Sequence, residues 1–255
     1  MKPTVWKHAQ VSVRGAAHLS NQLPCQDANG FLEVPGALVC ALADGAGSAS
    51  HADLGSELAV DASLDYFLSQ FLRVGVSGVE SMLNARCGLE MLEYVRQRIA
   101  REAHDKAVNI ADFASTLLVA VITPHRVAFY QVGDGLWCVC RNGILAAMTW
   151  PTGGEHAGET TFVTCEAAKR VLQFEMLEGG FDSIFGMTDG VERLAINLSG
   201  RVPHRGFLAP LVRELRKTIV PIFSTQLTQL LESDLVCQRT DDDKTLAIIL
   251  HEPNL

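Results

Sequence analysis

The stretch ALVCALADGAG, residues 37–47, is an unbroken apolar run that stops at an Asp-Gly pair. A short apolar run bounded by a turn dipeptide predicts a buried β-strand from Ala37 to Ala43. An aspartate at the end of such a strand places a rigid carboxylate at the edge of a hydrophobic core. The arrangement recurs along the chain, and it directs the functional interpretation.

The pattern around this strand predicts an α+β fold. Apolar residues at helical spacing predict helices near 56–72, 79–106, 207–218 and 222–233. Alternating or apolar runs predict strands near 5–14, 115–122, 126–132, 136–140, 144–148, 160–163, 171–176, 183–187 and 245–250. Asn142-Gly143 between two such runs indicates a hairpin. Hairpins make antiparallel sheets that the long helices must cover, so we expect a layered α+β sandwich rather than a doubly wound α/β fold.

Composition excludes several classes of protein. A chain of 255 residues with 48% hydrophobic residues and no dividing linker or repeat is expected to form one domain, 1–255. The formal net charge of -8 and the lack of a Lys/Arg-rich run exclude a typical nucleic-acid binder. No run approaches the roughly 20 apolar residues of a membrane span, and residues 1–10 lack the apolar segment of a signal peptide. Seven cysteines without a Cys-x-x-Cys pair argue against a disulfide framework or a zinc site, so we expect a cytoplasmic protein.

Single aspartates stand at strand edges throughout the chain, commonly beside a glycine. They occur in Gln26-Asp27, Asp44-Gly45, Gly133-Asp134-Gly135, Asp189-Gly190 and Asp241-Asp242-Asp243. Any one such pair is most often a plain turn. Gathered together, the carboxylates would repel one another unless cations neutralised them, and ligands that are all oxygen favour Mg²⁺ or Mn²⁺ over Zn²⁺.

The order of these motifs resembles that of the metal-dependent protein phosphatase family (type 2C), almost end to end. The matching landmarks are Gln26-Asp27, Asp44-Gly45-Ala46-Gly47, Ala114-Ser115-Thr116, Gly133-Asp134, Thr188-Asp189-Gly190 and Asp242-Asp243-Lys244-Thr245. Each motif alone is weak, but all six occur in family order. The Gln-Asp pair resembles a bacterial branch of the family. The resemblance implies a four-layer α-β-β-α sandwich with two central antiparallel sheets.

The resemblance also implies a role for each aspartate. Asp44 would bridge two Mn²⁺ or Mg²⁺ ions, and Asp189 and Asp242 would complete the shell of the first. The carbonyl of Gly45 would bind the second ion, with Asp27 supporting it directly or through water. Asp134 matches the position that helps to hold a weaker third ion in bacterial members. A water activated by the two ions would attack a phosphate monoester in line, so no cysteine or other side chain need act as nucleophile.

The chain departs from the family pattern near the expected phosphate. Gln26 replaces an acidic residue and contributes no charge. Many members carry an arginine a few residues earlier to hold the phosphate, and this chain offers two alternatives, His18 and Arg14. His18 lies nearer the family position, whereas Arg14 is the stronger anion ligand; His18 has an alternative role in packing or capping a turn.

Further departures concern proton transfer and the third ion. Ala46 stands where eukaryotic members often carry a histidine that acts as general acid. His51, at a predicted helix start, is a candidate substitute, with helix capping as its alternative role. Gly135 replaces the usual serine after Asp134. The Gly-, Thr- and Glu-rich segment 150–168 matches the place of a mobile flap near the family's active site.

The sequence therefore predicts a serine/threonine phosphoprotein phosphatase that depends on two, or three, Mn²⁺ or Mg²⁺ ions. Its expected partners are phosphoserine or phosphothreonine proteins and a cognate kinase. Two alternatives remain open: a non-catalytic, phosphatase-like binding module, and a phosphatase for small metabolites.

Overall fold

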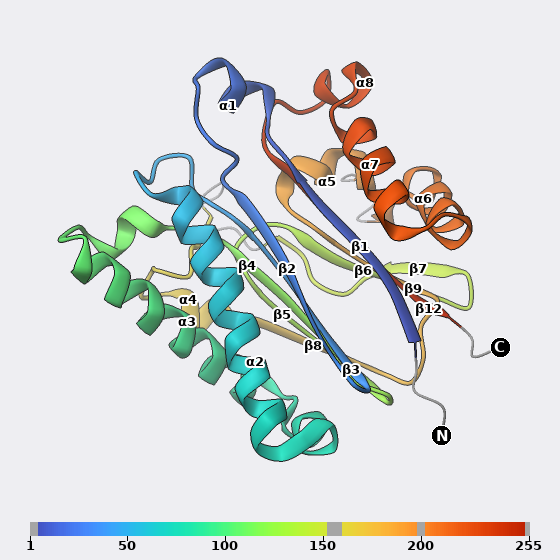
Figure 1. Ribbon diagram of the computed structural model, residues 1–255, viewed down its shortest axis with the longest axis horizontal. Helices are drawn as coiled ribbons and strands as arrows, with labels where there is room; N and C mark the ends of the chain where they lie inside the picture. The colour runs from blue at the N-terminus through green and yellow to red at the C-terminus, as the bar shows by residue number, and fades with distance from the viewer. Residues whose placement is uncertain (1–4, 152–159, 198–201, 253–255) are drawn as a thin grey trace.

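The computed structural model describes residues 5–151, 160–197 and 202–252. Within them, two five-stranded antiparallel sheets face each other (Figure 1). The first has the order β1 (Val5–Val13), β12 (Lys244–Glu252), β9 (Ser183–Met187), β6 (Leu136–Arg141), β7 (Ile144–Ala147). The second has the order β2 (Asp27–Val34), β3 (Ala37–Asp44), β4 (Leu117–Ile122), β5 (Arg126–Val132), β8 (Gln173–Glu178).

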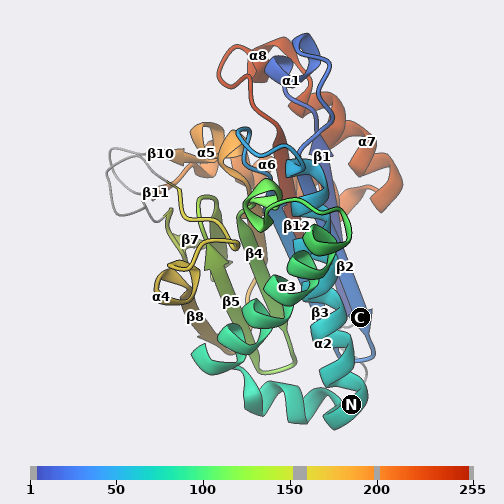
Figure 2. The same ribbon diagram turned by 90° about the vertical axis from the view of Figure 1, so that its left-hand side faces the viewer.

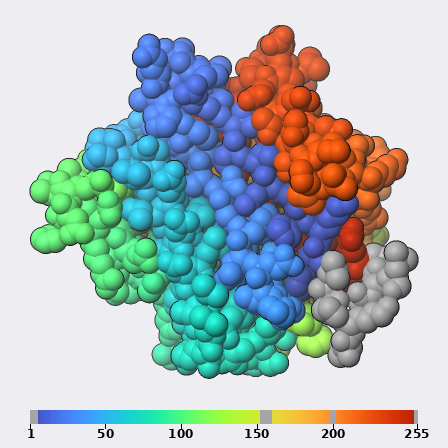
Figure 3. Space-filling model, viewed as in Figure 1, coloured from blue at the N-terminus to red at the C-terminus, as the bar shows by residue number. Residues whose placement is uncertain are grey.

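Helices cover the outer face of each sheet, which completes four layers (Figures 1 and 2). The long helices α2 (Ala52–Met82) and α3 (Ala85–Asp105) pack on the second sheet, and α6 (Arg205–Lys217) and α7 (Val220–Leu231) pack on the first. The short elements are α1 (Ala16–Ser20), η1 (Ile110–Phe113), α4 (Ala168–Val171), α5 (Asp189–Ala195), β10 (Ile196–Asn197), β11 (Val202–Pro203) and α8 (Asp234–Cys237). In Figure 3, β1 crosses the face between the α2 layer and the C-terminal helices. The α-β-β-α sandwich predicted from the sequence is confirmed.

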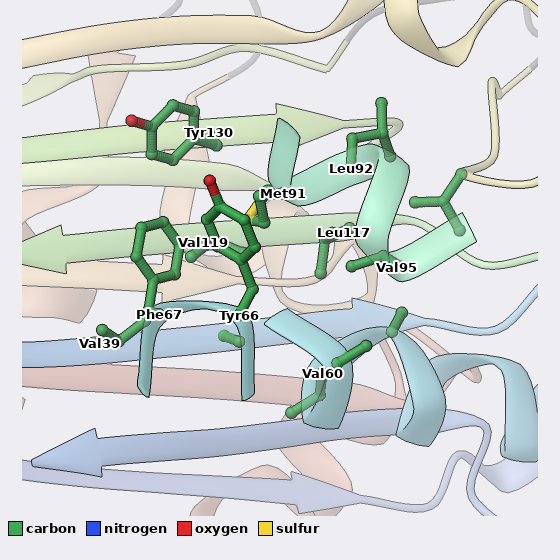
Figure 4. Close-up of a cluster of buried hydrophobic side chains, with 14 of the residues drawn as sticks. Val39, Val60, Tyr66, Phe67, Met91, Leu92, Val95, Leu117, Val119 and Tyr130 are labelled. Carbon is green, nitrogen blue, oxygen red and sulfur yellow. The ribbon is translucent and has the colours of Figure 1, made fainter. Parts of the chain in front are cut away.

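The position of strand β3 between two cores explains why its sequence is apolar without alternation. Ala37 to Ala43 are fully buried, because alternate side chains enter two different cores. Val39 and Ala41 pack with the helices α2 and α3 in the core that Figure 4 shows, together with Phe67. Leu38 and Leu42 point the other way and fill the space between the two sheets. A strand buried on both faces has no solvent-facing side, so its sequence needs no alternating polar residues.

Most predicted elements are present, with shifted ends. The hairpin at Asn142-Gly143 is confirmed, since both residues have positive φ (52° and 73°), as a type I′ turn requires. The predicted helix 79–106 was wrong in its start. Helix α2 continues to Met82 across a non-helical Gly75 (φ 68°), and α3 begins after Asn84, whose side chain accepts from the amide of Cys87.

Two other differences have clear causes. No strand forms at 160–163. Val163 is buried and its N–H donates to Ser115 O at 2.8 Å, but its carbonyl accepts from the Arg96 side chain at 2.6 Å. The predicted strand at 171–176 starts at Gln173, after α4. Strand β2 was not predicted, because Gly30 interrupts its pattern. A Cβ there would lie 2.8 Å from the end of the Leu64 side chain, so α2 packs directly over this glycine. Residues 152–159 of the predicted flap lie outside the described residues.

No helix in the described residues has both the length and the apolar character needed to cross a membrane.

Candidate functional site

Strand register brings the first two aspartates together. Strands β2 and β3 pair so that Asp27 lies directly opposite Asp44. The backbone of Asp44 is fixed on its other side by Thr116, whose hydroxyl accepts from Asp44 N at 2.9 Å and whose amide donates to Asp44 O at 2.8 Å. Gly45 follows in a tight space, since a Cβ there would lie 2.4 Å from Ala52 O. The Asp-Gly pair is thus fixed by the second sheet.

The first sheet contributes the next two aspartates from neighbouring strands. Asp189 opens α5 directly after β9, and Asp242 directly precedes β12. The two segments are in contact, because a Cβ on Gly190 would lie 1.9 Å from the carbonyl oxygen of Asp243. Glycine at 190 is therefore a condition of placing Asp189 beside Asp242.

Asp27 connects the two sheets through threonine hydroxyls. Its Oδ2 accepts from Thr188 Oγ1 at 2.8 Å and from Thr245 Oγ1 at 2.7 Å. Both threonines come from the first sheet: Thr188 follows β9, and Thr245 lies in β12. The other oxygen, Oδ1, is buried without a hydrogen-bond partner. One oxygen of Asp27 is held in place, and the other remains free for a ligand.

These residues border one cavity of about 210 Å³ at the end of both sheets. Its walls are His18, Gln26, Asp44, Gly45, Gly47, Asp134, Thr160, Phe162, Asp189 and Asp242. Asp27 lies beside it as the strand partner of Asp44. Of the six predicted metal-binding residues, five line the cavity and the sixth adjoins it.

Burial and mutual repulsion disfavour the ionised form of these carboxylates. Burial raises the pKa of Asp27 to about 7, against the opposing hydrogen bonds from Thr245 and Thr188. It raises the pKa of Asp189 to about 6, and repulsion by Asp242 adds to this. The pKa of Asp44 lies well above its ordinary range because of burial and then the charges of Asp27, Asp189 and Asp242. Divalent cations would remove this cost.

Unpartnered buried atoms support a cation site. Besides Asp27 Oδ1, the buried oxygens Asp189 Oδ1 and Gln26 Oε1 have no hydrogen-bond partner. The set is entirely oxygen, which suits Mg²⁺ or Mn²⁺. In the described residues no group of three or more His, Cys, Asp or Glu side chains is arranged to hold one ion. The residues fit the ions in chemistry, and binding requires their side chains to rearrange on this backbone.

Asp134 lies in the tight turn between β5 and β6. Both flanking glycines have positive φ, 90° at Gly133 and 99° at Gly135. Thr160 donates a hydrogen bond to Asp134, and Glu192 Oε1 accepts from Gly135 N at 2.9 Å. Burial raises the pKa of Asp134, and it raises that of Glu192 to about 7. Glycine at 135, where the family usually has serine, is explained by the backbone conformation.

The two phosphate-ligand alternatives differ in position. His18 lines the cavity, and its side chain is 13% exposed. Arg14 is exposed, does not line the cavity, and donates to Leu23 O at 3.2 Å. Ala46 is buried, and His51 stands at the start of α2 with its ring stacked on Phe113 at 5.2 Å, outside the cavity lining.

Several residues at the site were not predicted. Thr188 and Thr245 were quoted only as motif landmarks, although an hydroxyl beside each aspartate motif could have indicated their role as donors. Glu192 lies one helical turn after Asp189, a spacing that places both on one face of α5. Nothing in the sequence marked Thr160 or the burial of Asp243, which depend on contacts between distant segments.

Comparisons with known proteins agree with this architecture. The family described as Protein phosphatase 2C matches residues 14–232. Serine/threonine-protein phosphatase 3 of Escherichia coli (strain K12) is 34% identical over 253 residues, covering 96% of this chain and 98% of that protein.

Solved structures share the fold at low sequence identity. Serine/threonine phosphatase Stp1 from Staphylococcus aureus has a TM-score of 0.67 at 14% identity, covering 98% of this chain and 97% of that one. The catalytic domain of serine threonine protein phosphatase PstP in complex with 2 manganese ions has a TM-score of 0.60 at 16% identity, covering 96% and 98%. The chain therefore belongs to the protein phosphatase 2C family of metal-dependent phosphatases.

Proposed function

We propose that this protein is a serine/threonine phosphoprotein phosphatase that hydrolyses phosphomonoesters with two Mn²⁺ or Mg²⁺ ions bound in the 210 Å³ cavity. The observation that carries the proposal is the convergence of Asp44, Asp134, Asp189 and Asp242 on that cavity, beside Asp27. The curated E. coli relative, named a serine/threonine-protein phosphatase, supports the substrate class.

Each residue has a proposed role. Asp44 would be a ligand of both ions, Asp189 and Asp242 would hold the first, and Gly45 O with Asp27 would hold the second. Bound ions supply a water that ionises near neutral pH and positive charge for the phosphoryl oxygens. Asp134 would help to hold a third, more weakly bound ion.

The protein's own residues orient the substrate and the reacting water. Gln26 Oε1, buried and unpartnered, is placed to accept a hydrogen bond from a water at the cavity. His18 is the proposed phosphate ligand, since it lines the cavity and Arg14 does not. With Ala46 in place of a histidine, the leaving group takes its proton from water.

The test is Mn²⁺-dependent hydrolysis of phosphothreonine and phosphoserine peptides, compared with small phosphomonoesters. Asp189→Asn and Asp242→Asn should lower turnover by more than about 100-fold, because loss of outer-shell partners alone costs 10–100-fold. Asp241→Asn, an exposed neighbour in the same aspartate run, is the matched control and should stay within about twofold.

Other outcomes identify the alternatives. Full activity in either ligand variant, or in excess chelator, contradicts the metal mechanism. Mn²⁺ binding without turnover would indicate a non-catalytic module. Turnover of small phosphomonoesters without turnover of phosphopeptides would indicate a metabolite phosphatase. A cognate kinase and a cytoplasmic location complete the proposal.

A further inference from the structure

Asp243 differs sharply from its neighbour Asp242. Asp242 is exposed at the cavity, whereas Asp243 is 1% exposed and does not line it. Both oxygens of Asp243 are engaged by backbone amides: Oδ1 accepts from Gly15 N at 2.6 Å, and Oδ2 from Gln26 N at 2.5 Å. Asp243 therefore holds both ends of segment 15–26 rather than an ion.

The segment also lies against the backbone of the aspartate run. Ala17 N donates to Asp241 O at 2.9 Å. A Cβ on Gly15 would lie 2.3 Å from the carbonyl carbon of Asp242, so only glycine allows this approach. The backbone at the start of α1 is thus in direct contact with the backbone of Asp241 and Asp242.

The same carboxylate contacts the imidazole of His18 at the cavity. His18 Nδ1 lies 2.8 Å from Asp243 Oδ2, although the contact lacks the alignment of a hydrogen bond. A carboxylate facing Nδ1 favours the N–H at that nitrogen. Nε2, on the other side of the ring, is then the nitrogen that donates to a phosphate oxygen when the ring carries both protons. The fixed segment and the oriented ring together set where His18 meets the cavity.

We propose that Asp243 is a positioning residue for phosphate binding: its buried carboxylate holds segment 15–26 and the imidazole of His18 so that Nε2 serves the substrate phosphate. The inference rests on the proposed function and extends it to a residue outside the metal centre. Its charge acts through His18, and the metal ligands keep their places through the strands that carry them.

The test compares Asp243→Asn, His18→Gln and the double variant, with Asp241→Asn as the matched loss of charge. Asn keeps the shape of Asp243 but loses the charge that faces His18. Each single variant should raise KM for p-nitrophenyl phosphate, and Ki for inorganic phosphate, about tenfold, the loss expected for one charge-assisted hydrogen bond. The value of kcat and the Mn²⁺ affinity should change little, whereas the melting temperature of Asp243→Asn should fall, because its NH2 group cannot accept from one of the two backbone amides.

The double variant distinguishes positioning from a separate structural role. If Asp243 acts through His18, the double variant should show the same tenfold effect as each single variant. A multiplied effect of about 100-fold, or an unchanged KM in Asp243→Asn, overturns the proposal. If the wild type shows no Mn²⁺-dependent turnover, the proposed function itself is overturned.

A second measurement does not depend on folding of the Asp243 variant. ¹⁵N NMR of the wild-type histidines, with His18→Gln to assign the signal, should show a protonated Nδ1 on His18. An unprotonated Nδ1 would overturn the proposal, whatever the kinetics.

Discussion

At the scale of single residues, two hydroxyls determine how Asp27 meets a ligand. Thr188 and Thr245 donate to the same oxygen, Oδ2, and Thr245 also receives a contact from Ser12 Oγ at 2.6 Å. Because Oδ1 keeps no partner, the pair fixes the carboxylate with one oxygen free. Hydrogen bonds from the threonines also favour the anion that a cation needs.

Thr188→Val should therefore weaken metal binding without touching a metal ligand. Valine keeps the shape but removes one donor to Asp27 and the acceptor of Thr245 N, which bonds Thr188 Oγ1 at 2.9 Å. We expect Mn²⁺ affinity to fall about tenfold, as for other outer-shell partners. Thr188→Ser, which keeps the hydroxyl, is the control. Equal affinities in the two variants, measured by calorimetry, would show that the hydroxyl has no such role.

The choice between His18 and Arg14 shows what residue type alone cannot decide. Arginine is the better phosphate ligand in isolation. The structure directs Arg14 to Leu23 O and His18 to the cavity, because Asp243 contacts His18 from 225 positions away in the chain. Such a contact leaves no local pattern in the sequence.

At the scale of elements, the site depends on strand ends and on how closely they approach. The Asp27–Asp44 pair is a consequence of the register between β2 and β3. A shift of one residue would place the two carboxylates on opposite faces. The contact between α5 and the start of β12 is equally strict, because it passes through Gly190.

Gly190→Ala should disrupt this contact. The new Cβ would meet the backbone carbonyl of Asp243, which cannot move aside as a flexible side chain would. We expect a loss of about 3 kcal/mol in the free energy of unfolding, at the upper end for overpacking, together with loss of activity. Gly180→Ala, where nothing lies within 4 Å of the added atom, is the control. Urea unfolding of both variants measures the difference, and equal stabilities would contradict the contact.

Elements with a strong local signal were predictable, and those defined by distant contacts were not. Strand β3 and the Asn142-Gly143 hairpin follow from local pattern and turn chemistry. Strand β2 is interrupted by Gly30, whose purpose is visible only once Leu64 of α2 packs over it. Residues 160–163 resemble a strand because Val163 is buried, but they form no strand beyond an isolated bridge at Thr160.

At the scale of the whole molecule, two sheets bring buried acidic groups to one end. The pKa is raised to about 7 for Asp27 and Glu192 and to about 6 for Asp189, chiefly by burial. Between the ordinary values, near 4, and these values, the folded protein holds protons that the unfolded chain releases. The contribution of these three groups to the stability of the metal-free protein is therefore greatest below about pH 4 and falls as the pH rises to about 7.

Glu192→Gln should make this pH dependence shallower. A rise in pKa from 4.5 to about 7 corresponds to at most about 3 kcal/mol of lost stability at neutral pH. Urea unfolding in chelator at pH 5 and pH 8 compares the variant with the wild type, and the exposed Glu175→Gln is the control. A wild type that gains stability over this interval would contradict the assignment.

The aspartates stand apart in the sequence, between residues 27 and 242, and the fold gathers them from both sheets. The family resemblance predicted that gathering and the four layers. It did not predict the network of threonines around Asp27 or the role of Asp243, since these depend on side chains that meet only after the sheets have packed.

Calorimetric titration with Mn²⁺, on the wild type and on Asp44→Asn, tests the central claim most directly. If Asp44 bridges two ions at the cavity, the wild type should bind at least two Mn²⁺ ions, and the variant should lose both high-affinity sites together. Asp241→Asn should titrate as the wild type does. Unchanged stoichiometry and affinity in Asp44→Asn would contradict the account.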